Sequence, residues 1–158
     1  MYARQRKIGH SVLLALLTSY LGGCDGQPPL AAIEVLNYAN CQGAERGVRQ
    51  VSYAEVAQLR GSKLLGMTTE VSGATPAIIL LSVFKGPQPT PGFAFSLIAA
   101  SVVQGTAELI VQWHEPEANA VQVQMMTYPC LVIGIEPGDY TAVRVREGDG
   151  SLLGELAI

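Results

Sequence analysis

The pattern of hydrophobic and polar residues becomes regular after about residue 77. Beyond this point, apolar residues alternate with polar ones or form short continuous runs, and both patterns are typical of β-strands. Glycine, proline, aspartate and asparagine stand between the segments and indicate turns. The expected strands are Ile78–Phe84, Phe93–Leu97, Leu109–Trp113, Val121–Met125, Leu131–Ile135, Thr141–Arg146 and Leu152–Ile158.

The preceding part of the chain has a weaker pattern. It predicts short strands at Ile33–Leu36 and Val48–Val51 and one short helix directly after the second of them. Ser52 is a suitable N-cap, and Glu55 stands three residues later, as in a capping box. The apolar residues at helical spacing are Tyr53, Val56, Ala57 and Leu59. Gly61 is expected to end this helix.

Many short strands at close spacing predict a mainly β fold, an antiparallel sandwich or a barrel-like sheet, with an Ig-like arrangement as one form of it. The short helix is expected near one edge. The chain has 158 residues, 49 % of them hydrophobic and only 15 % charged, which suits one folded domain rather than a disordered chain. We place this single β-rich domain at residues 34–158.

The amino-terminal segment has the pattern of an export signal. Three cations within residues 1–7 precede an apolar stretch, 8–21, that is too short to span a bilayer comfortably. The sequence Leu21-Gly22-Gly23-Cys24 that follows resembles the lipobox of bacterial lipoproteins. The resemblance implies removal of residues 1–23, a diacylglycerol on the Cys24 thiol, and a fatty acid such as palmitate on the new amino terminus. An ordinary secretory signal, or a short amphipathic leader, is the alternative.

Removal of this signal changes the charge balance. The precursor has a formal charge of −3, and loss of three cations leaves −6. No basic patch with interleaved aromatic residues is present, so nucleic-acid binding has little electrostatic support. Attachment to a membrane would depend on the acyl chains, and residues 24–33 are expected to form a spacer. The expected location is the periplasm-facing cell envelope, and Asp25 beside Cys24 favours retention in the inner membrane.

Two further cysteines, Cys41 and Cys130, remain after Cys24 is assigned to lipid. An even pair in an exported, oxidising compartment predicts a disulfide. Two buried free thiols, or pairing of one cysteine with a partner protein, are the alternatives.

The mature chain offers little that resembles a catalytic or metal site. Its one histidine, His114, lies between strands beside Glu115 and Glu117, which could hold a metal only weakly. A solvated polar turn is the favoured interpretation, because no second histidine or spaced carboxylate set completes a site. No nucleophile motif or glycine-rich phosphate loop accompanies it. We therefore expect neither an enzyme nor a metal or cofactor other than the covalent lipid.

The region of about residues 78–146 contains a strand followed by the turn Thr90-Pro91-Gly92-Phe93. A proline-containing segment, Thr127–Val132, and a closing strand with Tyr140 and Val143–Val145 come later. In the order of these motifs the region resembles the C-terminal domain of the PrcB family of protease-complex subunits, in which the turn is written roughly Thr-Gly-Gly-Tyr. The resemblance implies a non-catalytic lipoprotein that associates with, and supports, an exported protease.

The turn itself is the candidate partner-binding site, with Thr90, Pro91, Gly92 and Phe93 as its residues. Its prolines restrict the loop before binding, so less conformational entropy is lost on association. A plain strand connection is the alternative for this loop. Two other functions remain open: a protease inhibitor, because Pro89–Phe93 is similar to the binding loop of chagasin-type inhibitors, and a structural or ligand-binding envelope lipoprotein. The large aromatics Trp113, Phe95 and Tyr128 are expected in the core.

Overall fold

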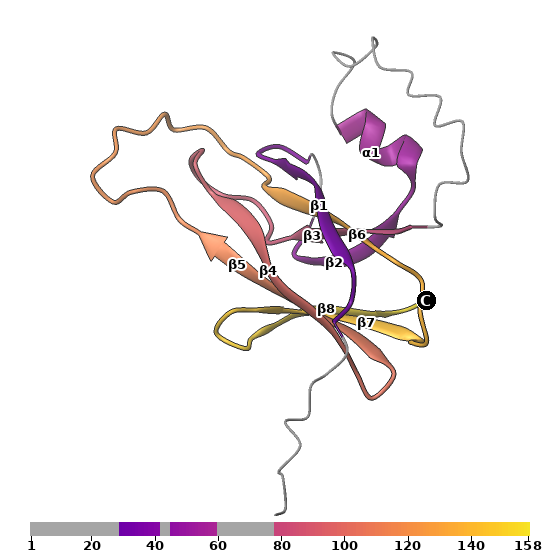
Figure 1. Cartoon of the computed structure of the whole chain (residues 1–158). Helices are drawn as coiled ribbons and strands as arrows, with labels where there is room; N and C mark the ends of the chain where they lie inside the picture. Colours follow the sequence, from indigo (N-terminus) through magenta and orange to yellow (C-terminus); the bar gives the residue numbers. More distant parts are fainter. Residues whose placement is uncertain (1–28, 42–44, 60–77) are drawn as a thin grey trace, which may run out of the picture.

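The computed structural model describes residues 29–41, 45–59 and 78–158. The predicted signal, Cys24 and the helix stop at Gly61 lie outside these residues. Within them the chain forms eight strands and one short helix (Figure 1). In chain order these are β1 (Ala32–Tyr38), β2 (Gly47–Val51), α1 (Tyr53–Leu59), β3 (Ile79–Phe84), β4 (Ala94–Val103), β5 (Thr106–His114), β6 (Cys130–Ile135), β7 (Ala142–Glu147) and β8 (Leu152–Ala157).

The strands form two four-stranded sheets that pack face to face. One sheet has the order β1-β6-β3-β2 and the other the order β4-β5-β7-β8. The main core lies between them, because alternate residues of both sheets point inward and are fully buried there. The largest of these core side chains include Leu81 and Ile133 from the first sheet and Phe95, Leu109 and Val143 from the second. The predicted mainly β sandwich is confirmed, and the described strands do not close into a barrel.

One strand pair departs from the expected antiparallel arrangement. β5 and β7 pair in parallel, with Thr106 opposite Ala142 and Val111 opposite Glu147. Between them the chain crosses to the other sheet to form β6 and then returns, so β7 enters in the same direction as β5. Parallel neighbours require such a long crossover connection. The prediction of a wholly antiparallel sheet was wrong for this pair because the hydrophobic pattern does not encode strand direction.

The expected strand at Val121–Met125 is absent. Residues 121–126 adopt no regular structure, and the exposed fractions of Val121 and Val123 are 104 % and 71 %. An alternating pattern forms a strand only where a neighbouring strand supplies hydrogen-bond partners and one face is buried. Both neighbouring strands along the chain, β5 and β6, already have partners on each edge. The segment therefore cannot pair with either strand next to it along the chain, and it joins none of the described edge strands.

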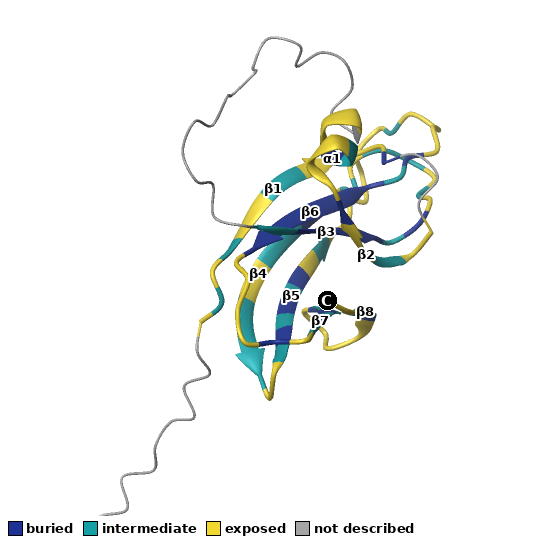
Figure 2. Cartoon of the chain, turned by 90° about the vertical axis from the view of Figure 1, so that its right-hand side faces the viewer, coloured by how far each residue is buried: buried dark blue, intermediate teal, exposed yellow. Residues whose placement is uncertain are grey.

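The helix α1 begins as predicted and covers the outer face of the first sheet (Figure 2). The Ser52 backbone N–H donates to Glu55 Oε2 at 2.7 Å, and the Glu55 N–H donates to Ser52 Oγ at 3.2 Å. This is the reciprocal capping box that the sequence indicated. Val56 is buried in a second hydrophobic cluster with Leu80 and Val132. The central strand β6 is therefore covered on both faces, and all six of its residues are buried.

A disulfide joins Cys41 to Cys130, as predicted. Their Cα atoms are 5.9 Å apart, and both residues are buried beside Phe84. The bond connects the end of β1 to the first residue of β6 across 89 residues of sequence. Constraint of so long a loop in the unfolded chain stabilises the fold by up to about 4–5 kcal/mol.

The folded domain begins slightly before the expected boundary. The Leu30 N–H donates to the Ala100 carbonyl at 3.2 Å, and Pro29 forms an isolated bridge with Ser101. β1 starts at Ala32, within the segment expected to be a spacer. These backbone contacts attach the start of the described chain to the far end of β4. Among the described residues, no helix is long and apolar enough to cross a bilayer.

Candidate partner-binding surface

The proline-rich loop between β3 and β4 is held against the segment that leads into β6. Gln88 and Thr127 exchange two backbone hydrogen bonds, at 2.8 and 2.9 Å. Thr127 is itself buried, and its Oγ1 donates to the Thr90 carbonyl at 2.9 Å. Three hydrogen bonds therefore fix the loop, two at Gln88 and one at Thr90, the first of the residues proposed from the sequence to bind a partner. A loop held in this way loses little conformational entropy on association.

Gly92 places this loop against the turn that follows β5. Its φ is +96°, a backbone conformation that residues with a side chain rarely adopt. A Cβ at this position would lie 2.9 Å from the Pro116 Cβ. Glycine is thus required at position 92 both by the positive φ and by the close approach of Pro116.

Phe93, the last residue of the motif, packs on Trp113. Their rings are stacked, with centroids 5.4 Å apart and an interplanar angle of 19°. Phe95 contacts the same indole at 4.7 Å, with a tilted geometry. Phe95 is a core residue and Trp113 is half-buried against the core, so the predicted core packing of both is confirmed. Phe93 therefore anchors the loop to the domain through an aromatic contact.

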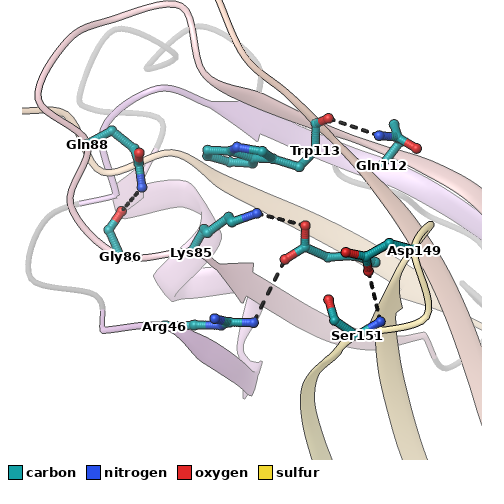
Figure 3. Close-up of polar contacts among 9 residues, drawn as sticks. Arg46, Lys85, Gly86, Gln88, Gln112, Trp113, Asp149 and Ser151 are labelled. Carbon is teal, nitrogen blue, oxygen red and sulfur yellow. Dashed lines mark hydrogen bonds and ion pairs between the residues drawn. The ribbon is translucent and has the colours of Figure 1, made fainter.

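A buried carboxylate lies next to this aromatic group. The Lys85 ammonium is 4.8 Å from the Trp113 ring centroid and 2.7 Å from Glu147 Oε2 (Figure 3). Arg46 Nη2 is 3.9 Å from the other oxygen of Glu147. Glu147 is the last residue of β7, whereas Lys85 follows β3, so the ion pair joins the two sheets. The sequence analysis missed this group because its charges are 62 residues apart along the chain.

The hairpin after Glu147 is fixed by a local contact. Asp149 accepts a hydrogen bond from the Ser151 N–H at 2.8 Å (Figure 3). This bond to the charged carboxylate lowers the pKa of Asp149 below its usual value. The carboxylates at this end of the second sheet therefore have defined structural partners.

A groove opens beside the fixed loop. It has a volume of about 300 Å³ and is lined by Pro91, Gly92 and residues 120–123. Residues 121–126 carry four large apolar side chains that are more than half exposed: Val121, Val123, Met125 and Met126. We call residues 90–93 together with residues 120–126 the loop-end surface. Contiguous exposed apolar side chains of this kind mark interaction sites more often than isolated ones do.

His114 takes part in a contact that the sequence did not indicate. It is the last residue of β5 rather than part of the turn, and its Nε2 lies 2.8 Å from Ser96 Oγ on β4. Across the described residues, no carboxylate hydrogen-bonds to His114, and no group of three or more metal-ligating side chains is assembled. Glu115 and Glu117 are exposed. The geometry is that of a cross-strand polar pair at the sheet surface.

The structure thus brings the predicted motif together with a second segment. Thr90–Phe93 lies beside residues 120–126, a segment that contains the strand expected at Val121–Met125. The run of two methionines at positions 125 and 126 was the one local sign of an exposed surface, because it interrupts the alternation. Cys24, the proposed lipid attachment site, lies outside the described residues.

Comparison with known families gives one match. Residues 79–136 match the family described as PrcB C-terminal. The matched region extends from the start of β3 to one residue beyond β6 and contains the whole loop-end surface. No curated protein and no solved structure matches the chain. The match confirms the resemblance noted in the sequence: residues 79–136 are similar to the PrcB C-terminal family.

Proposed function

We propose that this protein is a non-catalytic, lipid-anchored protein of the bacterial cell envelope that binds and stabilises an exported protease complex. The family match fits an association with a protease complex in general terms. The observation that carries the proposal is the loop-end surface, where a loop fixed by three hydrogen bonds adjoins exposed apolar side chains. A rigid apolar patch suits stable association with another protein.

The start of the described chain and the loop-end surface lie at opposite ends of β4, which supports this role. The first described residue, Pro29, pairs with Ser101, whereas the loop-end surface adjoins Ala94 at the other end of β4 (Figure 1). A strand rises about 3.4 Å per residue, so these two ends are separated by roughly 20–25 Å. A lipid anchor at Cys24 would therefore tether the domain at the end opposite to the loop-end surface. A partner could then approach that surface from the periplasm.

The anchor itself is tested separately. Cells that produce the protein are labelled with an alkyne analogue of palmitate, and Cys24→Ala is the matched variant. We expect label on the wild-type chain and none on the variant, together with release of the variant from the membrane fraction. Equal labelling, or no labelling of either protein, would refute a lipid anchor at Cys24. Separation of inner from outer membranes tests the inner-membrane location favoured by Asp25.

The inhibitor alternative makes a different use of the same loop. An inhibitory loop must insert side chains into a protease cleft, whereas the Phe93 ring is stacked on Trp113 and Gly92 is packed against Pro116. This packing favours a supporting contact over insertion. Purified protein added to papain-like proteases is expected to leave their activity unchanged, and stoichiometric inhibition would establish the alternative.

The partner is identified by site-specific photo-crosslinking in the native envelope. A photoreactive residue replaces Val121, which is fully exposed, and Asp139 in the exposed β6–β7 loop provides the control position. We expect position 121, but not 139, to crosslink to an exported protease whose lifetime shortens in cells that lack this protein. Crosslinks to no protease, or an unchanged protease lifetime, would contradict the proposed function.

A further inference from the structure

Residues 121–126 form a segment without regular secondary structure, and its backbone pairs with no described strand. No backbone hydrogen bond in the described chain involves any of these six residues. Both ends of the segment are nevertheless fixed. On one side the Ala120 N–H donates to the Glu117 carbonyl at 3.0 Å, and on the other side Thr127 is bonded to Gln88. The segment is therefore held at each end while its donors and acceptors face no partner strand.

The sequence of this segment is that of a strand. Val121, Val123 and Met125 alternate with glutamines, which is the pattern of a strand with one apolar face. In addition, Gln122 Oε1 is buried and lacks a hydrogen-bond partner within the described part of the chain. A buried acceptor without a donor is unfavourable until a donor is supplied. The segment has both the pattern and the unmet hydrogen-bonding capacity of a sheet edge.

The charges beside the groove indicate the charge of a partner strand that would bind residues 121–126. Glu115 and Glu117 flank Pro116, which contacts the groove residue Gly92, and neither glutamate forms an ion pair with a described cation. Lys85 and Arg46 pair with Glu147 instead. The apolar groove is thus bordered by uncompensated negative charge.

We propose that residues 121–126 accept an extended strand of the partner protein by β-augmentation, and that this strand has alternating apolar residues flanked by arginine or lysine. Main-chain hydrogen bonds to residues 121–126 would supply affinity, and apolar side chains would enter the groove beside Pro91 and Gly92. Glu115 and Glu117 would select the basic flanks. The proposal rests on the proposed function, because it names the chemistry of the partner at the loop-end surface.

A second copy of this chain is a poorer occupant than a basic strand. Two copies paired through residues 121–126 would bring two Glu115–Glu117 pairs near the same interface with no cation to neutralise them. Like charges placed close together oppose association. Sedimentation of the purified chain tests this point directly: we expect a monomer, and a dimer abolished by Val123→Lys would overturn the proposal.

The test uses the full-length chain and synthetic peptides. The probe alternates valine and threonine between arginine residues at both ends. One matched peptide replaces the arginines with glutamates, and another keeps every side chain but carries N-methyl groups on alternate backbone nitrogens. We expect the arginine peptide to bind roughly tenfold more tightly than the glutamate peptide, because exposed ion pairs contribute modestly. N-methylation should weaken binding by about tenfold or more, since it removes several main-chain donors.

Two protein variants complete the test. Glu115→Lys with Glu117→Lys should reverse the preference to the glutamate peptide. Glu136→Lys with Asp139→Lys makes the same charge change at two exposed acids near the opposite end of β6, and should leave the preference unchanged. Hydrogen exchange should show new protection of amides within residues 121–126 when the arginine peptide is bound.

The outcomes separate this inference from the proposed function. Equal binding of the N-methylated peptide, an unchanged preference in the Glu115→Lys and Glu117→Lys variant, or absence of peptide binding would each overturn strand addition. A protease could still crosslink to position 121 in those cases, and the proposed function would stand. Conversely, selective peptide binding without a protease crosslink would support strand addition and refute the protease as partner.

Discussion

Gly92→Ala is expected to destabilise the domain by about 2–4 kcal/mol. An alanine with φ of +96° costs roughly 1–2 kcal/mol in backbone strain. The added methyl group would also lie 2.9 Å from the Pro116 Cβ, and such overpacking costs about 1–2 kcal/mol more because both loops must shift. The free energy of unfolding, measured by urea denaturation, reports the sum.

Gly150→Ala is the matched control. Gly150 has a similar φ of +87°, but a Cβ there would meet nothing within 4 Å. It should cost only the backbone strain of roughly 1–2 kcal/mol. The effect of alanine on the unfolded chain is the same at both positions, so it cancels in the comparison. The difference between the two variants therefore isolates the contact between the loop and the turn.

Pro116→Gly provides the rescue. It removes the Cβ that the new methyl group would meet, so the double variant with Gly92→Ala should show a favourable coupling of about 1–2 kcal/mol. Equal losses for Gly92→Ala and Gly150→Ala, together with no coupling to Pro116→Gly, would refute the close packing of the two segments. The loop-end surface would then lack the rigidity that the proposed function needs.

Three further predictions follow from the same structure. Cys41→Ala with Cys130→Ala should lower the free energy of unfolding by up to about 4–5 kcal/mol, and reductant should then have no further effect on urea unfolding. Glu147→Gln should cost about 1–2 kcal/mol, because it leaves two cations without their buried carboxylate, whereas Glu155→Gln at an exposed pair should leave the free energy of unfolding nearly unchanged in the same assay. Hydrogen bonds from Ser52 lower the pKa of Glu55 in the folded protein below 4.5. The stabilisation of α1 by the Glu55 carboxylate is therefore present above pH 4.5 and is lost as the pH falls through the lower pKa of the folded state. Hydrogen exchange of the α1 amides should accelerate over that pH range, and Glu55→Gln should remove this pH dependence.

The local parts of the fold could be predicted because each has a self-contained signal. The capping box needs only Ser52 and Glu55 three residues apart, and it forms as expected. The continuous apolar run of β3 and the alternation of β5 likewise define buried positions without reference to other strands. The pairing of Cys41 with Cys130 was predicted from the count of cysteines in a chain that we expect to be exported.

Features that depend on three-dimensional neighbours could not be predicted in the same way. The parallel pairing of β5 with β7 follows from a crossover between sheets, which leaves no mark in the strand sequences. The ion pair of Lys85 with Glu147 joins residues that only the sandwich brings together. The candidate motif Thr90–Phe93 stays a prediction, and its neighbour in space, residues 120–126, had no signal in the sequence that placed it beside the motif.

The error at residues 121–126 is itself informative. Natural sequences agree with their structures at most levels, and disagreements tend to fall at functional or strained sites. Here the alternation of Val121, Gln122 and Val123 predicts a strand, yet the segment pairs with none of the described strands. The same segment borders the predicted binding motif, and none of the backbone hydrogen bonds between described residues involves it. A strand pattern without a partner among the described residues is what a sequence needs if the partner strand belongs to another protein.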